Sequence, residues 1–263
     1  MIGIFDSGVG GLTVLRALRA RMPSADFVYF GDTENAPYGN KSRREIAELV
    51  AMALLRLRAA GATDIVNACN TASAAIHDAL LDLLRINVFT VVGMLEPTVE
   101  ALVERHKQTA IFCTRATGDS GIYQKQCAAR GVRADVIVVP TLAGLIERGA
   151  PDDELLSVVR PAVRDAVAHG AEVLSLSCTH FPLVRDMFEA CLREDGSAAG
   201  VFDPADAVAA EAARVFSSDG AGSLRFMVSG PAEVFAQRVA ELFPDLPHRV
   251  EDAGSIYWAL KAK

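Results

Sequence analysis

Hydrophobic and polar positions along this chain follow two alternating patterns. Short apolar runs, typical of buried strands, are followed by longer stretches with apolar side chains three or four positions apart, typical of amphipathic helices. Repeated alternation of strand and helix is characteristic of domains built on mainly parallel sheets. The sequence therefore predicts an α/β fold.

The individual runs give the order of the expected elements. Strands are predicted at 2–5, 27–30, 65–68, 88–92, 109–113, 136–139, 174–178 and 224–228. Helices are predicted at 12–22, 43–60, 75–84, 120–131, 152–169, 187–192 and 231–243, with others from Pro97, from Ala205 and around Trp258. Pro161 predicts a kink or a break in the helix 152–169, because proline lacks the N–H that a helix interior uses.

Two of the predicted strands end in a cysteine. Cys69 follows the strand 65–68, and Cys178 ends the run that begins at Leu174; hydroxyl, amide or imidazole side chains follow each of them. In open α/β sheets ligands bind at the carboxyl ends of strands, and a helix N-terminus there favours thiolate and carboxylate groups. Two such motifs, about a hundred residues apart, predict two similar halves that face each other.

Two loops that follow predicted strands carry polar groups suited to ligand binding. The loop 31–39 is dense in turn-forming and polar residues. The loop 6–11, DSGVGG, joins a strand to a helix N-terminus, whose unpaired N–H groups can bind an anion. Its glycines lack the GxxxxGK[ST] and GxGxxG spacings of nucleotide-binding motifs. A tight turn in which Asp6 or Ser7 caps the helix explains this loop equally well.

Composition mainly argues against certain partners and locations of the protein. The chain has 263 residues, of which 51% are hydrophobic and 22% charged, as is ordinary for a globular enzyme or binding protein. The net charge of −7, without a basic cluster, argues against a nucleic-acid partner. We find no signal peptide and no apolar run of membrane length, so no membrane association is expected. Five cysteines without a CxxC pair indicate free thiols and a cytoplasmic location.

Other kinds of cysteine chemistry fit the sequence less well. Free cysteine is usually a buried apolar residue, and we interpret Cys113, Cys127 and Cys191 in this way. Zinc requires three or four ligands, whereas Cys178 with His180 is a single Cys-x-His pair, so we expect no metal. A cysteine hydrolase uses one thiol with a His and an Asn or Asp, which leaves the motif at Cys69 unexplained.

Four segments taken together resemble the aspartate/glutamate racemase family, and within it the glutamate racemases. They are GIFDSGVGGLTV at 3–14, GDTENAPYGNKS at 31–42, ACNTASA at 68–74 and CTHFPL at 178–183. Further matches are the pattern of Thr114, Thr117, Ser120 and Tyr123, the helix entry at 203–205, and Gly230-Pro231. The resemblance implies two α/β domains related by a pseudo-twofold axis, one formed by 1–93 with 205–263 and the other by 94–204. It also implies an active site in the cleft between them.

The activity implied by the resemblance is a cofactor-independent interconversion of L- and D-glutamate. Cys69 and Cys178 would lie on opposite faces of the substrate α-carbon, where one thiolate removes a proton and the other thiol returns one. Two bases are needed because a single base tends to return the proton to the face it came from. In this family the isomerase supplies D-glutamate for peptidoglycan, which would link the chain to cell-wall biogenesis and cell shape.

The resemblance also assigns roles to other residues. Asp6 is expected to assist Cys69, and His180 with Glu147 to assist Cys178. Substrate contacts are expected from Ser7, Pro37, Tyr38, Gly39, Asn70, Thr71, Thr114, Thr117 and Thr179. Hydroxyls, amides and backbone N–H groups can bind a dianionic amino acid without strong cations. Family members are commonly dimers, so the resemblance implies a homodimer. The sequence itself does not indicate the oligomeric state.

Three departures from the family pattern lie near the expected site. Ser177 stands where Gly or Ala is usual, Asn67 where the strand is usually apolar, and Glu34-Asn35 where small and basic residues are common. Ser177 would narrow the approach to the thiol, and Asn67 would either hydrogen-bond near Cys69 or satisfy a buried edge.

These departures leave two alternatives open. One is a racemase for aspartate or another acidic amino acid, and the other is a catalytically silent amino-acid-binding homologue. A related decarboxylase would carry only one of the two cysteines. The first strand begins almost at Met1, so the resemblance implies no activating N-terminal extension.

Overall fold

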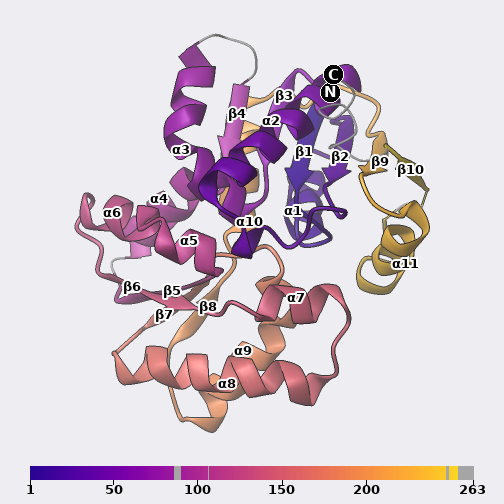
Figure 1. The fold of residues 1–263 in the computed structure, drawn as a ribbon. Coiled ribbons are helices and arrows are strands. Elements are labelled where there is room, and N and C mark those ends of the chain that lie inside the picture. Colours follow the sequence, from indigo (N-terminus) through magenta and orange to yellow (C-terminus); the bar gives the residue numbers. More distant parts are fainter. Residues whose placement is uncertain (86–89, 106, 247–248, 254–263) are drawn as a thin grey trace.

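The chain folds around two parallel sheets (Figure 1). The computed structural model describes residues 1–85, 90–105, 107–246 and 249–253. Within these residues the first sheet has six strands in the order β10-β9-β2-β1-β3-β4, and the second has four in the order β6-β5-β7-β8. Every recorded strand pair is parallel, from β1 with β2 to β7 with β8. The predicted α/β fold is confirmed.

The strands and helices alternate through most of the chain. The strands are β1 Ile2–Asp6, β2 Phe27–Gly31, β3 Asp64–Asn67, β4 Thr90–Gly93, β5 Thr109–Cys113, β6 Ala134–Val138, β7 Val173–Leu176, β8 Gly200–Phe202, β9 Leu224–Val228 and β10 Val250–Asp252. The helices are α1 Leu12–Arg21, α2 Arg43–Ala59, α3 Asn70–Arg85, α4 Leu95–Arg105, α5 Arg115–Asp119, α6 Ile122–Ala128, α7 Leu142–Glu147, α8 Asp152–Ala168, α9 Arg185–Glu194, α10 Ala205–Val215 and α11 Ala232–Leu242. Two 3₁₀ turns, η1 Tyr38–Asn40 and η2 Phe181–Val184, follow β2 and β7.

The two sheets share a common strand order. The segment β2-β1-β3-β4 of the first sheet corresponds to β6-β5-β7-β8 of the second, in the same sequence order. In this correspondence β3, which precedes Cys69, matches β7, which precedes Cys178. The two halves predicted from the cysteine motifs are therefore similar in topology.

Helices cover both faces of each sheet, and each face has its own apolar core. In the first half, one core packs α1, α10 and α11 on the sheet, and another packs α2 and α3 on the opposite face. In the second half, α7, α8 and α9 lie on one face and α4 and α6 on the other. α10 follows β8 of the second sheet in sequence, yet its Val208, Ala209 and Ala212 are buried against α1. The helix predicted from Ala205 thus returns to the first half, as expected.

Several predicted elements have the observed bounds or nearly so, and the differences have local causes. The strands at 109–113 and 224–228 are confirmed, and Ser42 caps α2 by a capping box with Glu45. The helix predicted from Pro97 begins at Leu95, because a first turn tolerates proline. Pro161 lies inside α8, which continues to Ala168, so of the kink or break predicted there, the break does not occur.

The region after β5 differs most from the prediction. The segment after β5, for which no helix was predicted, forms the short helix α5, and Gly121, with φ of 64°, separates α5 from α6. The predicted helix 120–131 is therefore shorter and begins at Ile122. The short elements α7, β8 and β10 were not predicted. The predicted helix around Trp258 and the start of the predicted strand 88–92 lie outside the described residues.

No helix in the described part of the chain is both long enough and apolar enough to span a bilayer. All five cysteines are free thiols and are buried.

Candidate active site

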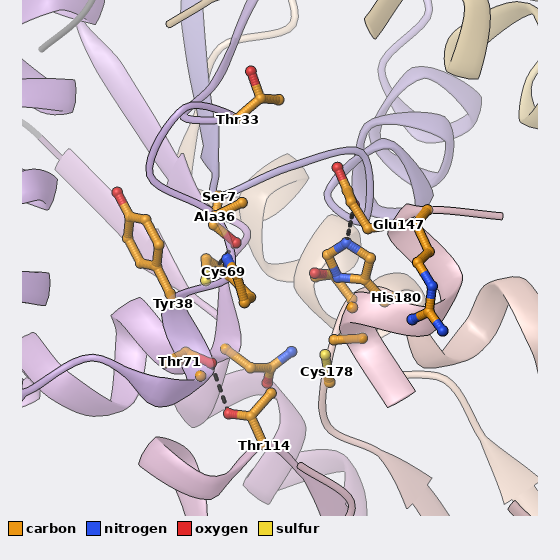
Figure 2. Close-up of a pocket in the computed structure, with 17 residues that line it drawn as sticks. Ser7, Thr33, Ala36, Tyr38, Cys69, Thr71, Thr114, Glu147, Cys178 and His180 are labelled. Carbon is orange, nitrogen blue, oxygen red and sulfur yellow. Dashed lines mark hydrogen bonds and ion pairs between the residues drawn. The ribbon is translucent and has the colours of Figure 1, made fainter. Parts of the chain in front are cut away.

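A pocket of about 250 Å³ lies between the two halves and contains both cysteine motifs (Figure 2). Loops at the carboxyl ends of β1, β2 and β3 form one wall, and residues after β5, on α7 and after β7 form the other. The lining residues are Ser7, Thr33, Ala36, Pro37, Tyr38, Gly39, Cys69, Asn70, Thr71, Thr114, Ala143, Gly144, Glu147, Arg148, Cys178, Thr179 and His180.

Every site residue expected from the sequence lines this pocket except Asp6 and Thr117. Asp6 is fully buried behind the wall. Thr117 lies behind Thr114, with 3.1 Å between the two hydroxyl oxygens. The lining residues that were not singled out are Thr33, Ala36, Ala143, Gly144 and Arg148. Thr33 and Ala36 belong to a loop whose composition indicated binding, whereas the others lie on or beside α7, which is too short to give a periodic signal.

Cys69 lies between β3 and the first turn of α3. Its sulfur accepts the Ala72 N–H at 3.5 Å, and its thiol donates to Ser7 Oγ at 3.7 Å. Burial raises the pKa of Cys69 to about 12, and the charge of Asp6 adds to this, while the Ala72 and Ser7 hydrogen bonds oppose it. The low-pKa thiol expected at a helix N-terminus is therefore not found at Cys69.

Asp6 shapes the loop after β1 rather than capping α1. Its carboxylate accepts the Gly8 N–H at 2.9 Å and the Thr179 hydroxyl at 3.1 Å, and Gly11, at the N-cap of α1, has no side-chain cap. The helix-cap interpretation of this loop is therefore wrong. Burial raises the pKa of Asp6, although the charge of His180 and hydrogen bonds from the loop N–H groups oppose that shift. Asp6 acts on Cys69 through its charge, since the recorded hydrogen bonds of that sulfur go to other residues.

Cys178 lies beside an imidazole–carboxylate pair. His180 Nε2 is hydrogen-bonded to Glu147 Oε2, as the dashed line in Figure 2 shows, and Cys178 lies close enough to the His180 ring to influence its pKa. Burial alone would lower the pKa of His180, but its interactions with Cys178 and Glu147 raise it well above its usual value. For Glu147, burial opposes ionisation, but the hydrogen bond and charge of His180 prevail and lower the pKa of the carboxyl. The pair therefore favours imidazolium and carboxylate.

Two glycines allow the loop of the first half to contact the second. A Cβ on Gly10 would lie 2.6 Å from both His180 Nδ1 and Thr179 Oγ1, and a Cβ on Gly8 would lie 2.8 Å from Glu147 Oε1. A Cβ at either position would therefore displace its neighbour, which at Gly10 is the His180–Thr179 loop and at Gly8 is the carboxylate end of Glu147. The GVGG sequence thus brings the loop after β1 against the Cys178 side of the pocket.

The wall beside Cys69 offers hydrogen-bond donors for an anion. Asn70 Oδ1 accepts the Tyr123 hydroxyl at 2.6 Å, which fixes the amide, while Asn70 Nδ2 is buried without a partner among the described residues. Thr71 Oγ1 and Thr114 Oγ1, from opposite halves, are 2.9 Å apart, and Figure 2 marks this contact. An unpaired buried N–H is costly, so a ligand oxygen that accepts from Asn70 would relieve the cost.

The three departures from the family pattern lie outside the pocket lining. Ser177 is fully buried, and its hydroxyl oxygen lies 3.0 Å from that of Ser175, so its side chain does not face the pocket. Both polar side-chain atoms of Asn67 are buried without a partner among the described residues, so neither expected role of this amide is found. Glu34 is exposed, and buried Asn35 donates to Asp32 at 2.9 Å. In the part of the chain that the structure describes, no cluster of three metal-ligating side chains occurs.

Comparison with known proteins gives consistent matches over most of the chain. Residues 13–212 match the family model described as Asp/Glu/Hydantoin racemase. The chain is 35% identical over 252 residues to a glutamate racemase of Cereibacter sphaeroides, covering 87% of this chain and 91% of that protein. It is 37% identical over 253 residues to a glutamate racemase of Thermus thermophilus, covering 91% of this chain and 92% of that protein.

Solved structures give the same result. The glutamate racemase from Thermus thermophilus in complex with β-chloro-D-alanine superposes with a TM-score of 0.82 at 32% identity, covering 96% of this chain and 95% of that one. A glutamate racemase isoform from Bacillus anthracis has a TM-score of 0.84 at 26% identity, covering 97% and 96%. An aspartate racemase from Picrophilus torridus shares the fold, with a TM-score of 0.56 at 18% identity over 80% of this chain and 91% of that one.

Proposed function

Because the chain belongs to the Asp/Glu/hydantoin racemase family and is an isomerase of the racemase type, we propose that its substrate is glutamate, whose L and D enantiomers it interconverts. The observation that carries this proposal is the presence of both Cys69 and Cys178 in the lining of one pocket, each delivered by an equivalent strand. The glutamate racemases among its relatives support the choice of substrate.

The proposed mechanism is a two-base proton transfer. The thiolate of one cysteine takes the α-proton, and the C–H electron pair is delocalised into the substrate carboxylate. The thiol of the other cysteine then gives its proton to the opposite face of the α-carbon. The two sulfurs exchange protonation states, so the reaction runs equally well in reverse. Proton transfer of this kind consumes no electrons and transfers no other group, so we propose that the reaction is independent of a cofactor.

Each thiol has a different proposed partner. His180, held by Glu147, stabilises the Cys178 thiolate as an imidazolium and takes or returns its proton. On the other side, Asp6 is proposed to assist Cys69 through its charge, which disfavours thiolate and so favours the protonated, proton-donating form of that cysteine. The raised pKa of Asp6 lets it become neutral, which would ease ionisation of Cys69 when that cysteine acts as the base.

Substrate binding is proposed to use neutral donors. Asn70 Nδ2 is buried and unpaired among the described residues, and it suits one carboxylate oxygen. Further contacts are proposed from the backbone of 37–39, from Thr117 behind the wall through Thr114, from Thr179, and from the hydroxyls of Ser7, Thr71 and Thr114. Dipoles that are already oriented stabilise developing negative charge better than solvent does, because they need not reorganise.

Other parts of the expected biology are also proposals. We propose that the D-glutamate formed serves peptidoglycan synthesis, that the protein acts in the cytoplasm, and that it forms a homodimer. The proposed domain division, 1–93 with 205–263 and 94–204, is supported by the strands that each sheet contains. Light scattering of the purified protein tests the dimer.

Racemisation in D₂O tests the function. Each enantiomer of glutamate is incubated with the protein, and circular dichroism follows inversion while proton NMR follows exchange at the α-carbon. We expect both signals from both enantiomers. Absence of inversion and of exchange would sink the proposal, and tight glutamate binding by calorimetry without turnover would indicate a silent homologue. Faster inversion of aspartate than of glutamate would identify the alternative substrate.

A further inference from the structure

Arg238 connects the two halves of the protein at a point away from the pocket lining. It lies on α11, whose Phe235 and Val239 are buried in the core of the first half. Its Nη2 donates a hydrogen bond of 3.0 Å to the carbonyl oxygen of Ile146 on α7, in the second half. Figure 1 labels both helices, α7 and α11. Its Nη1 forms an ion pair with Glu241, one turn further along α11, and its side chain is only 20% exposed.

The carbonyl that Arg238 contacts belongs to the residue before Glu147. α7 has six residues, and a helix this short has little stability of its own, because nucleation of a helix is costly. Ile146 O also accepts the Gly149 N–H at 3.0 Å, so this carbonyl is the point where the end of α7, the loop that follows it and α11 meet. A cation at the C-terminus of a helix also interacts favourably with its unpaired carbonyl groups.

We propose that Arg238 is a positioning residue that holds the last turn of α7, and with it Glu147, against His180. The proposal deepens the proposed function and rests on it only for the role of the Cys178 side in catalysis. Glu147 itself lies at the C-terminal end of α7 and reaches His180 on the loop after β7. Release of α7 from α11 would therefore separate Glu147 from the imidazole without removing any residue that lines the pocket.

The charges around Glu147 define what Arg238 should change. Glu147 is faced by His180, by the N–H of Val9 and by Arg238, and the carboxylate of Asp6 lies within electrostatic range of the pair. Burial opposes the ionisation of Glu147, while the positive charges of His180 and Arg238 favour it. Loss of Arg238 would weaken this support. His180 would then hold its proton less strongly, and the Cys178 thiolate would lose its neighbouring imidazolium.

The test compares Arg238→Met, which keeps the apolar stem, with Arg238→Lys, which keeps the charge and a donor. We expect Arg238→Met to lower kcat for glutamate about tenfold, because a small displacement of a catalytic pair is costly, with a change of no more than about twofold in KM. The acidic limb of the pH profile of kcat should move to higher pH in Arg238→Met, because the Glu147 carboxylate loses the nearby positive charge of Arg238. Arg238→Lys should recover most of kcat and the original limb.

Gln237→Ala is the matched control. Gln237 is the exposed neighbour of Arg238, and its Nε2 donates to the same Glu241, at 3.1 Å, without a recorded contact to α7. This variant should behave as the wild type does. A merely structural link would lower the melting temperature of Arg238→Met but leave the pH profile unchanged. That result, or a kcat equal to the wild-type value, would overturn the proposal.

A second measurement separates this proposal from the proposed function. Alkylation of Cys178 by iodoacetamide, resolved by peptide mass spectrometry, needs no turnover of glutamate. Near neutral pH, the rate in Arg238→Met should be about threefold lower than in wild type, because thiolate reactivity depends on the neighbouring imidazolium. If the wild type does not racemise glutamate while this difference is present, the proposed function fails and the positioning role remains. Equal alkylation rates in an active protein would refute the positioning role alone.

Discussion

The Thr179 hydroxyl donates a hydrogen bond of 3.1 Å to Asp6 Oδ2 and so joins the loop after β7 to the loop after β1. Thr179 is adjacent to Cys178, and Asp6 is adjacent to Ser7, whose hydroxyl contacts the sulfur of Cys69. The segment that carries Cys178 is thus linked by a buried hydrogen bond to the loop after β1, which in turn contacts the sulfur of Cys69 through Ser7. The distance between the two thiols therefore depends in part on the Thr179–Asp6 hydrogen bond, which does not involve the substrate.

Removal of either thiol should abolish racemisation. Replacement of Cys69 or Cys178 by Ser substitutes a hydroxyl, which is a far weaker acid than a thiol, at one face of the α-carbon. We expect kcat/KM to fall about 10³-fold or more in each variant, within the range of general acid–base contributions. Measurement of inversion by circular dichroism checks this. Cys191→Ser, a buried thiol outside the pocket lining, serves as control and should remain active.

Gly10→Ala should separate the two loops. The added Cβ would meet His180 Nδ1 and Thr179 Oγ1 at 2.6 Å, so one loop must move. We expect kcat/KM to fall about a hundredfold, because a displacement of an ångström in a catalytic site has this order of cost. Gly200→Ala, where an added Cβ has no neighbour within 4 Å, should change the rate little. Equal activity of both alanine variants would show that the close approach is unimportant.

The His180–Glu147 pair should make stability depend on pH. The folded pKa of His180 is raised above 6.5, so its contribution is full below that value and is lost as pH rises through the folded pKa. The folded pKa of Glu147 is lowered from 4.5, so its contribution is present above 4.5 and is lost as pH falls through the folded pKa. The free energies of unfolding of wild type and Glu147→Gln, measured with urea, should therefore differ most between about pH 4.5 and pH 6.5. A difference that does not change with pH would contradict the assignment of charge to this pair.

Asn67 should be a site where an apolar substitution stabilises the protein. Both polar atoms of its side chain are buried without partners among the described residues, at the end of a strand that otherwise favours apolar residues. Asn67→Val should raise the free energy of unfolding by about 1 kcal/mol, since the cost of an unpaired buried amide is removed. Urea denaturation measures this.

The control for that substitution is Asn35→Leu. Asn35 is also buried, but its Nδ2 donates to Asp32 at 2.9 Å, so its loss should destabilise the protein by about 1–3 kcal/mol. Destabilisation by both substitutions would mean that Asn67 makes a contact in solution, for example with a bound water molecule.

Much of the fold could be predicted because its main elements are periodic. The buried strands such as 109–113 and the amphipathic helix α2, with its capping box, carry strong local signals. α7, β8 and β10 are too short to show a period, and their place depends on packing against the rest of the fold. Pro161 is the opposite case, in which the local sequence gives a signal that the structure does not follow. Proline predicts a break, but packing of α8 on its sheet keeps the helix continuous.

The site was predictable where function depends on sequence motifs and not where it depends on packing. Cys69 and Cys178 were identified because each ends a strand and is followed by polar residues. Asp6 is buried against Thr179, which is 173 positions away in sequence, and burial together with the charge of Asp6 raises the pKa of Cys69. No local sequence pattern reports either contact. Arg148 and Arg238 could not be predicted for the same reason. Arg148 lies at the end of α7 and Arg238 contacts that helix, and α7 itself has no periodic signal in the sequence.

The unlike surroundings of the two thiols also constrain the kinetics. If the reaction is the proposed one, substrate and product are mirror images with equal free energies in water, so kcat/KM must have the same value in both directions. Cys69 faces a hydroxyl and a carboxylate charge, whereas Cys178 faces an imidazole–carboxylate pair. Any preference that this asymmetry creates must therefore appear as paired changes: the enantiomer with the lower KM is also turned over more slowly, by the same factor.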